Sequence, residues 1–178
     1  MKKVLVMLVT AAALLQAGSF TLESNDLEGQ LSMKEVFNGF GCTGKNISPA
    51  LSWKDAPKGT KSFALTVYDP DAPTGSGWWH WVVFNLPATV TSLPSDAGNA
   101  AKALMPKGAV QSLTSYGKGG FGGACPPAGD RAHRYVFTVY ALDVEALDLD
   151  ASAMPALVGY MLNAHAIEKA SLISYYGR

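Results

Sequence analysis

Two acidic residues and two prolines follow one another in the run Asp69-Pro70-Asp71-Ala72-Pro73. The prolines fix the backbone and remove amide donors, so this loop is stiff. Two carboxylates held two residues apart repel each other unless a positive group or a hydrogen-bond donor lies nearby. The run is therefore a candidate for one half of a binding site. The alternative is that one or both acids only close a turn.

His80 lies within a cluster of tryptophans at the start of a second apolar segment. Strand alternation predicts that His80 shares a face with Val82, and that Trp81 points to the opposite face. An imidazole among large apolar rings is desolvated and needs an acid or another acceptor. Asp69 or Asp71, a short distance upstream, is the expected partner. The alternative is a core histidine without contact to a ligand.

A glycine-rich stretch, residues 119–130, contains Cys125 and Pro127 and leads into His133 and Tyr135. Glycine allows backbone amides to approach a ligand closely, and successive amides can form a concave anion site. His133 and Tyr135 are two residues apart in a predicted strand, so their imidazole and phenol share a face. The stretch therefore adds candidate anion ligands to those of the Asp-Pro loop.

Short apolar runs separated by Gly, Pro, Asn and Asp must position these residues, and this pattern is typical of strands. The sequence predicts a single β-rich sandwich domain over residues 18–178. The expected strands are residues 20–22, 51–53, 62–68, 79–86, 135–142 and 171–176.

One segment has helical instead of strand periodicity. Ser152 is the expected cap of its first turn, and Pro155 is tolerated that early in a helix. The apolar residues recur at the spacing of one helix face: Met154, Leu157, Val158, Met161 and Leu162.

The composition excludes some classes of partner. Of the 178 residues, 48% are apolar and 16% are charged, as in a globular protein that buries its own core. Without Lys2 and Lys3, 12 basic residues face 14 acidic ones, for a formal charge of −2. Nucleic acid is not an expected partner, because holding it requires clustered positive charge.

Residues 1–17 have the pattern of a bacterial secretory signal peptide, with two lysines followed by an apolar stretch that ends at Ala17. We therefore expect a periplasmic or otherwise exported protein, and no transmembrane segment in the mature chain. The alternative is that this stretch is an uncleaved anchor or a buried first strand. Cys42 and Cys125 are the two cysteines, and thiols tend to pair in an oxidising compartment. A disulfide between them is expected, and two buried free thiols are the alternative.

Three segments together resemble the phosphatidylethanolamine-binding protein (PEBP) family, whose bacterial branch is called Raf-kinase-inhibitor-like. They are residues 69–73, His80-Trp81 with the following Asn85-Leu86-Pro87, and Pro126-Pro127 with the following His133-Arg134-Tyr135. They occur in the order that this family shows. The resemblance extends over essentially all of the mature chain.

The resemblance implies an antiparallel Greek-key β-sandwich with a few short helices and a small surface cavity where the three segments meet. The family binds phosphate, phospholipid headgroups or phosphorylated groups there. Eukaryotic members end with a helix that partly covers the cavity, whereas this chain ends after a strand, so a more open mouth is expected. Matching positions imply these ligand-binding residues: Asp69, Asp71, Pro73, His80, Cys125 through its amide, Pro127, His133 and Tyr135.

The same resemblance gives Trp81 and Arg134 a supporting role behind the cavity. It implies a binding protein that needs no cofactor, and some relatives regulate or inhibit a partner protein. The competing hypothesis is a hydrolase, in which the acids and histidines hold a metal or act as general acid and base. The sequence does not determine the oligomeric state or the natural ligand.

Overall fold

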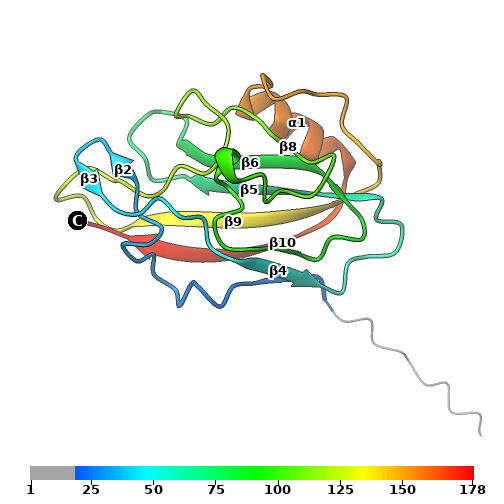
Figure 1. The fold of residues 1–178 in the computed structure, drawn as a ribbon, viewed down its shortest axis with the longest axis horizontal. Helices are drawn as coiled ribbons and strands as arrows, with labels where there is room; N and C mark the ends of the chain where they lie inside the picture. Colours follow the sequence, from blue (N-terminus) through cyan, green and yellow to red (C-terminus); the bar gives the residue numbers. More distant parts are fainter. Residues whose placement is uncertain (1–18) are drawn as a thin grey trace, which may run out of the picture.

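The computed structural model describes residues 19–178, in which ten strands and one α-helix are present (Figure 1). The expected leader, residues 1–17, lies outside the described residues. The larger sheet has the strand order β10-β9-β5-β6-β8, and every neighbouring pair is antiparallel. Its strands are β5 (Ser62–Asp69), β6 (Trp78–Pro87), β8 (Val110–Gln111), β9 (His133–Leu142) and β10 (Ala166–Tyr176).

The order β9-β5-β6-β8 is that of a Greek key, because β9 returns beside β5 instead of pairing with β8. The predicted antiparallel Greek-key fold is therefore confirmed. The return brings the start of β9, with His133, next to the end of β5, with Asp69. Two smaller sheets complete the structure: β1 (Thr21–Glu23), β4 (Leu51–Lys54) and β7 (Ser92–Leu93) form one, and β2 (Asn38–Gly39) and β3 (Cys42–Thr43) form the other.

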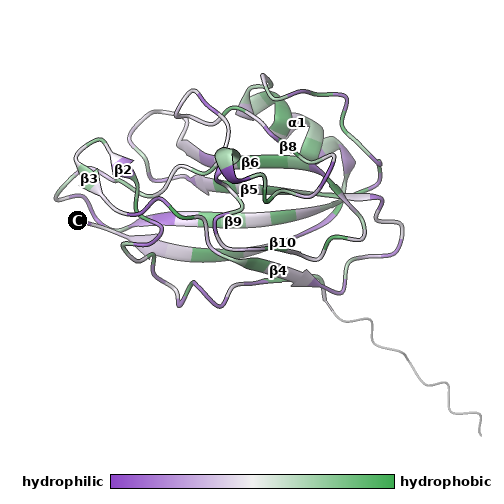
Figure 2. Cartoon of the chain, viewed as in Figure 1, coloured by the Kyte–Doolittle hydropathy of each residue, from purple (hydrophilic) through white to green (hydrophobic). Residues whose placement is uncertain are grey.

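The larger sheet is covered on both faces, so that its central strands are almost continuously buried. On one face, Leu65 and Phe137 pack against Leu22 and Trp53 from the smaller sheet. The other face packs against the helix α1 (Pro155–His165). Figure 2 shows hydrophobic residues concentrated in β4, β6 and α1, whereas the first residues of β9 are hydrophilic.

The predicted helix is present, but its cap and part of its apolar face differ from the prediction. Val158 and Leu162 are buried, whereas Met154 is 67% exposed and Leu157 is 47% exposed. Ser152 does not cap the helix. Its hydroxyl donates instead to Asp150, because the helix begins three residues after Ser152 with Met154 at the N-cap.

The six predicted strands are all found, and the one at the C-terminus begins at Ala166, directly after α1, instead of at residue 171. The two-residue strands β2, β3, β7 and β8 were not predicted. Runs this short have no alternation to detect. Among the described residues, no helix has both the length and the apolar content that crossing a membrane requires.

Candidate functional site

A cavity of about 210 Å³ opens where the end of β5, the start of β6, the start of β9 and the loop before β9 meet. We call it the histidine cavity. Seven of the eight predicted ligand-binding residues line it, and Asp71 does not. Its lining is Phe40, Asp69, Ala72, Pro73, Thr74, Trp78, His80, Tyr116, Cys125, Pro126, Pro127, His133 and Tyr135.

Asp69 both closes its own turn and holds a histidine. One carboxylate oxygen, Oδ1, accepts hydrogen bonds from the amides of Asp71, at 2.8 Å, and Ala72, at 3.1 Å. The other, Oδ2, accepts from Nδ1 of His133 at 2.8 Å, and both side chains are buried. Both carboxylate oxygens of Asp69 thus accept hydrogen bonds. These donors screen the negative charge of Asp69 from an anion in the cavity, and the bond to Nδ1 fixes the imidazole of His133.

Asp71 turns away from the cavity. Its carboxylate is 4% exposed and accepts from Nε of Arg134 at 2.8 Å, from Nη2 of Arg134 at 2.9 Å, and from Arg131 at 2.9 Å. The guanidinium of Arg134 holds the pKa of Asp71 well below its usual range. The placement of Asp71 at the cavity is therefore wrong, because the two acids take different partners: Asp71 pairs with guanidinium groups and Asp69 with the imidazole of His133. Arg134 has the expected place outside the lining.

A β-bulge directs His80 into the cavity. In the pairing of β5 with β6, Val67 faces Trp81 and Tyr68 faces Trp79, so His80 has no partner opposite it. A bulge adds one residue to a strand and re-aims the side chains around it. His80 therefore points to the same face as Trp81, where its ring meets Tyr135 edge-on at 5.1 Å between centroids. The predicted face shared with Val82 is wrong.

The hydrogen-bond partner of His80 is a backbone carbonyl. Nδ1 donates to the carbonyl oxygen of Gly122 at 2.7 Å, so neither Asp69 nor Asp71 is its partner, contrary to the prediction. Burial lowers the pKa of His80 to about 4, against the raising effect of the Gly122 hydrogen bond. The ring is therefore neutral near pH 7, with its proton on Nδ1. Nε2 is buried and has no hydrogen-bond partner in the described part of the chain.

Two tyrosines complete the polar part of the cavity. The hydroxyl of Tyr135 is buried and, within residues 19–178, has no hydrogen-bond partner. Burial raises the pKa of Tyr135 above its usual value, so the phenol stays protonated. Tyr116 also has a pKa raised by burial, and its hydroxyl donates to the carbonyl of Gly123 at 2.7 Å. Two residues that line the cavity thus carry buried polar atoms without a partner in the described chain: the acceptor Nε2 of His80 and the phenol of Tyr135.

The glycine-rich stretch passes close behind these rings. A Cβ atom at Gly122 would collide with the ring of Tyr116, so no other residue fits there without displacing that ring. The amide of Gly123 donates to Oδ1 of Asn46 at 2.7 Å, and the Asn46 amide group donates to the carbonyl of Phe121 at 3.2 Å. Asn46 therefore fixes the residues immediately before and after Gly122, the residue that pairs with His80.

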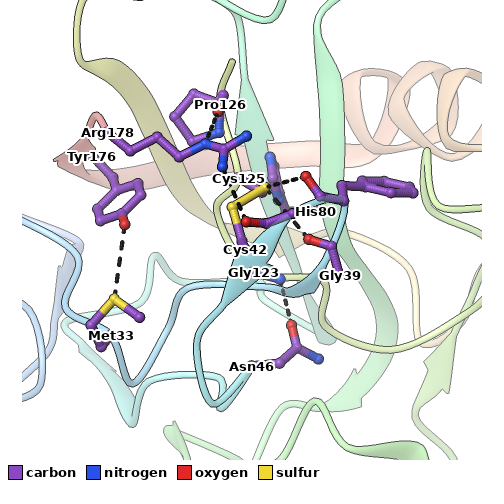
Figure 3. The surroundings of a disulfide bond; sticks show 12 residues. Met33, Gly39, Cys42, Asn46, His80, Gly123, Cys125, Pro126, Tyr176 and Arg178 are labelled. Carbon is purple, nitrogen blue, oxygen red and sulfur yellow. Dashed lines mark hydrogen bonds between the residues drawn. A yellow bond between two sulfur atoms is a disulfide. The ribbon is translucent and has the colours of Figure 1, made fainter. Parts of the chain in front are cut away.

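A disulfide joins Cys42 to Cys125 and ties the β2–β3 hairpin to the cavity wall. Phe40, at the tip of this hairpin, is 68% exposed and lines the mouth. Figure 3 shows Arg178 beside the disulfide: its Nε donates to the carbonyl of Pro126 at 2.7 Å, and its Nη1 donates to that of Gly41 at 3.2 Å. The expected disulfide is confirmed, and Arg178 links the same two segments.

The phosphatidylethanolamine-binding protein family model matches residues 24–177, nearly the whole of the described chain. The chain belongs to the PEBP family. The UPF0098 protein YbcL of Escherichia coli is 55% identical over 163 residues, covering 90% of this chain and 89% of YbcL. The UPF0098 protein YbhB of the same organism is 52% identical over 157 residues, covering 87% of this chain and 98% of YbhB.

Two solved structures support the same assignment. The crystal structure of E. coli YbcL, described as a new member of the mammalian PEBP family, gives a TM-score of 0.88 at 54% identity. It covers 90% of this chain and 99% of YbcL. A PEBP homologue from Chlamydia trachomatis gives a TM-score of 0.73 at 32% identity, covering 90% of this chain and 98% of that one. The resemblance to the PEBP family is thereby confirmed.

Six residues that line the histidine cavity were not predicted. Trp78 lies in the tryptophan cluster beside His80, and Ala72, Thr74 and Pro126 are neighbours of predicted residues, so proximity to the motifs could have indicated them. Phe40 lies two residues before Cys42, so the expected disulfide to Cys125 could have indicated it, whereas no predicted site residue lies near Tyr116 in the sequence. These two rings reach it through the disulfide-tied hairpin and through the segment after β8, and they stack on one another at 5.8 Å between centroids.

Two further observations concern the supporting role expected of Trp81 and the hypothesis of a metal-dependent hydrolase. Trp81 is fully buried outside the lining and donates from Nε1 to Gln111 at 2.7 Å, consistent with support from behind. Within residues 19–178, no group of three or more His, Cys, Asp or Glu side chains is arranged to hold a metal ion. The chemistry that the cavity offers is hydrogen bonding to a ligand that carries both an acceptor and a donor.

Proposed function

We propose that this PEBP-family protein binds a small phosphate-bearing ligand, either a phospholipid headgroup or another phosphorylated group, without turning it over. The observation that carries the proposal is that two residues lining one cavity each have a buried polar atom without a partner among the residues described. His80 Nε2 and the Tyr135 hydroxyl are both buried without a partner in residues 19–178. Buried polar groups are normally paired, so such groups at a cavity point to a missing ligand.

A phosphate oxygen fits these groups and their surroundings. Tyr135 can donate to it, and His133, held by Asp69 through Nδ1, presents its other nitrogen at a long 3.4 Å from Asp130. The singly protonated form of a phosphate monoester, such as phosphoethanolamine, can donate in turn to His80 Nε2. Aromatic walls formed by Phe40, Trp78 and Tyr116 surround the polar end. Apolar walls with a few placed polar groups are characteristic of small-molecule sites.

The family name supports a headgroup as the ligand, because family members are named for binding phosphatidylethanolamine. We include in the proposal that residues 1–17 direct export and that the mature protein, starting near Gly18, acts as a binding or regulatory protein outside the cytoplasm. The disulfide is compatible with this location. Intact-mass measurement of protein from the periplasmic fraction tests export: a mass corresponding to residues 18–178 supports it, and a full-length mass contradicts it.

The binding test uses phosphoethanolamine and NMR of the histidine side chains. The chain has three histidines. His80 and His133 line the cavity, whereas His165 contacts Asp143 at the end of α1 and serves as an internal control. We expect the resonances of His80 and His133 to move on titration while those of His165 stay in place. Unchanged resonances, or equal movement of all three, would contradict the proposal.

A further inference from the structure

A second and larger hollow, of about 600 Å³, lies on another side of the glycine-rich stretch. Residues 45–47, 96, 98–102 and 118–121 contribute most of its wall. It shares no residue with the histidine cavity. We call it the basic hollow, after the three lysines described next. Its volume is within the range of small-molecule sites, roughly 300–1,000 Å³.

Three lysines and a single acidic residue line the basic hollow: Lys45, Lys102, Lys118 and Asp96. Lys102 is paired with Asp96 at 2.6 Å. Among the described residues, Lys45 and Lys118 have no carboxylate within ion-pair distance. Two positive charges are therefore uncompensated at this hollow, in a chain whose residues 18–178 carry a formal charge of −2. Such a local excess of positive charge attracts anions.

Free backbone donors lie in the same wall. In residues 19–178, the amides of Gly119 and Gly120 donate no hydrogen bond to protein. Gly120 has φ +94°, and a Cβ atom there would lie 2.7 Å from the carbonyl oxygen of Gly98. The next amide, of Phe121, donates to that carbonyl at 2.9 Å and anchors the turn. The turn is therefore held in place by its neighbours while two of its donors remain available.

We propose that the basic hollow binds an anionic, hydroxylated small molecule about the size of a monosaccharide, with its charge on a phosphate or a carboxylate. Lys45 and Lys118 provide the charge, and Asn99 provides an amide for hydroxyl groups. The histidine cavity is lined largely by aromatic rings, whereas the basic hollow is lined mainly by lysine, asparagine, glycine and alanine, with Phe121 as its single aromatic ring. This lining favours a hydroxylated ligand over a lipid.

Titration of ¹⁵N-labelled mature protein with glucose 6-phosphate, glucuronate and glucose tests the proposal. We expect the amides of Gly119 and Gly120 to shift with one or both anions and not with glucose. Phosphate as the anchor predicts a response to glucose 6-phosphate, and a carboxylate predicts a response to glucuronate. A shift of equal size with glucose, or no shift with either anion, would overturn the proposal.

Charge variants make the test specific. Lys45→Gln/Lys118→Gln should bind the anion about tenfold more weakly, since hydrogen bonds to charged groups contribute more than neutral ones. Lys58→Gln/Lys61→Gln removes the same charge from residues outside the hollow and should leave the affinity unchanged. Equal affinities for both variants would refute the assignment. The resonances of His80 and His133 report the histidine cavity separately, so failure at one site is distinguishable from failure at the other.

Discussion

The neutral state of His80 predicts that the histidine cavity distinguishes a phosphate ester from a sulfate ester. Nδ1 carries the proton because it faces the carbonyl of Gly122, so Nε2 can only accept. Burial lowers the pKa of this imidazole to about 4. At pH 7 about one molecule in a thousand is therefore protonated, and adding the proton costs about 4 kcal/mol. A ligand oxygen that pairs with Nε2 must bring a proton of its own.

Phosphoethanolamine can supply this proton, because a phosphate monoester has a second pKa near ~6. Ethanolamine O-sulfate has the same size but no such proton, so it would leave Nε2 unpaired. An unpaired buried group costs about 1–3 kcal/mol, which corresponds to sulfate binding that is roughly 5- to 150-fold weaker. Above pH ~6 the monoprotonated phosphate becomes about tenfold scarcer for each pH unit. The affinity for phosphoethanolamine should fall in the same proportion.

Isothermal titration calorimetry with both esters from pH 5 to 8, at constant ionic strength, measures these ratios. His80→Phe removes the acceptor and should bring the two affinities together, whereas His165→Gln should preserve the difference. Equal binding of the two esters by the unmodified protein, combined with a phosphate affinity that does not fall between pH 6 and 8, would refute the proposed role of Nε2.

Three further predictions concern stability. Unfolded His80 takes up a proton near pH 6.5 but folded His80 only near pH 4, so the free energy of unfolding should fall by up to about 3 kcal/mol as the pH is lowered from 6.5 to 4. Urea titrations across this range measure the loss, which should be smaller in His80→Phe. The disulfide closes a separation of 83 residues, so reductant should lower the free energy of unfolding by about 4–5 kcal/mol, with no effect on Cys42→Ala/Cys125→Ala. Asn46→Leu leaves two backbone groups of the glycine stretch unpaired, which should lower the free energy of unfolding by about 1–3 kcal/mol per group and with it the thermal midpoint. Asn46→Asp keeps the acceptor for Gly123 and should lower the free energy of unfolding by less.

The sequence was sufficient to predict the long strands and their antiparallel arrangement. In β5, Ser62 to Asp69, apolar residues are buried on both faces, and the run is long enough to detect. The bulge at His80 was not predictable, because strand alternation assumes one residue of β6 for each residue of β5. One additional residue was enough to reverse the predicted face of His80. Register is a property of the pair of strands and cannot be read from either strand alone.

The candidate site shows the same division between local and long-range information. Asp69, His80 and His133 lie in recognisable motifs, and the structure places all three at one cavity. Their hydrogen-bond partners come from distant segments: His133 pairs with Asp69, 64 residues before it, and His80 pairs with the carbonyl of Gly122, 42 residues after it. The expectation that the nearest acid would pair with His80 failed because the Greek-key return brings β9, and with it His133, next to Asp69.

The glycine-rich stretch explains why two sites can share one loop. Its carbonyls at Gly122 and Gly123 accept from His80 and Tyr116 on the side of the histidine cavity, while the side chain of Asn46 pairs with Gly123 and Phe121. The preceding turn, whose amides are free, lines the basic hollow. Side chains at these glycines would collide with rings or backbone on both sides. The absence of side chains is therefore what allows the backbone to lie against the ring of Tyr116, which lines the histidine cavity, and against the carbonyl of Gly98, which lines the basic hollow.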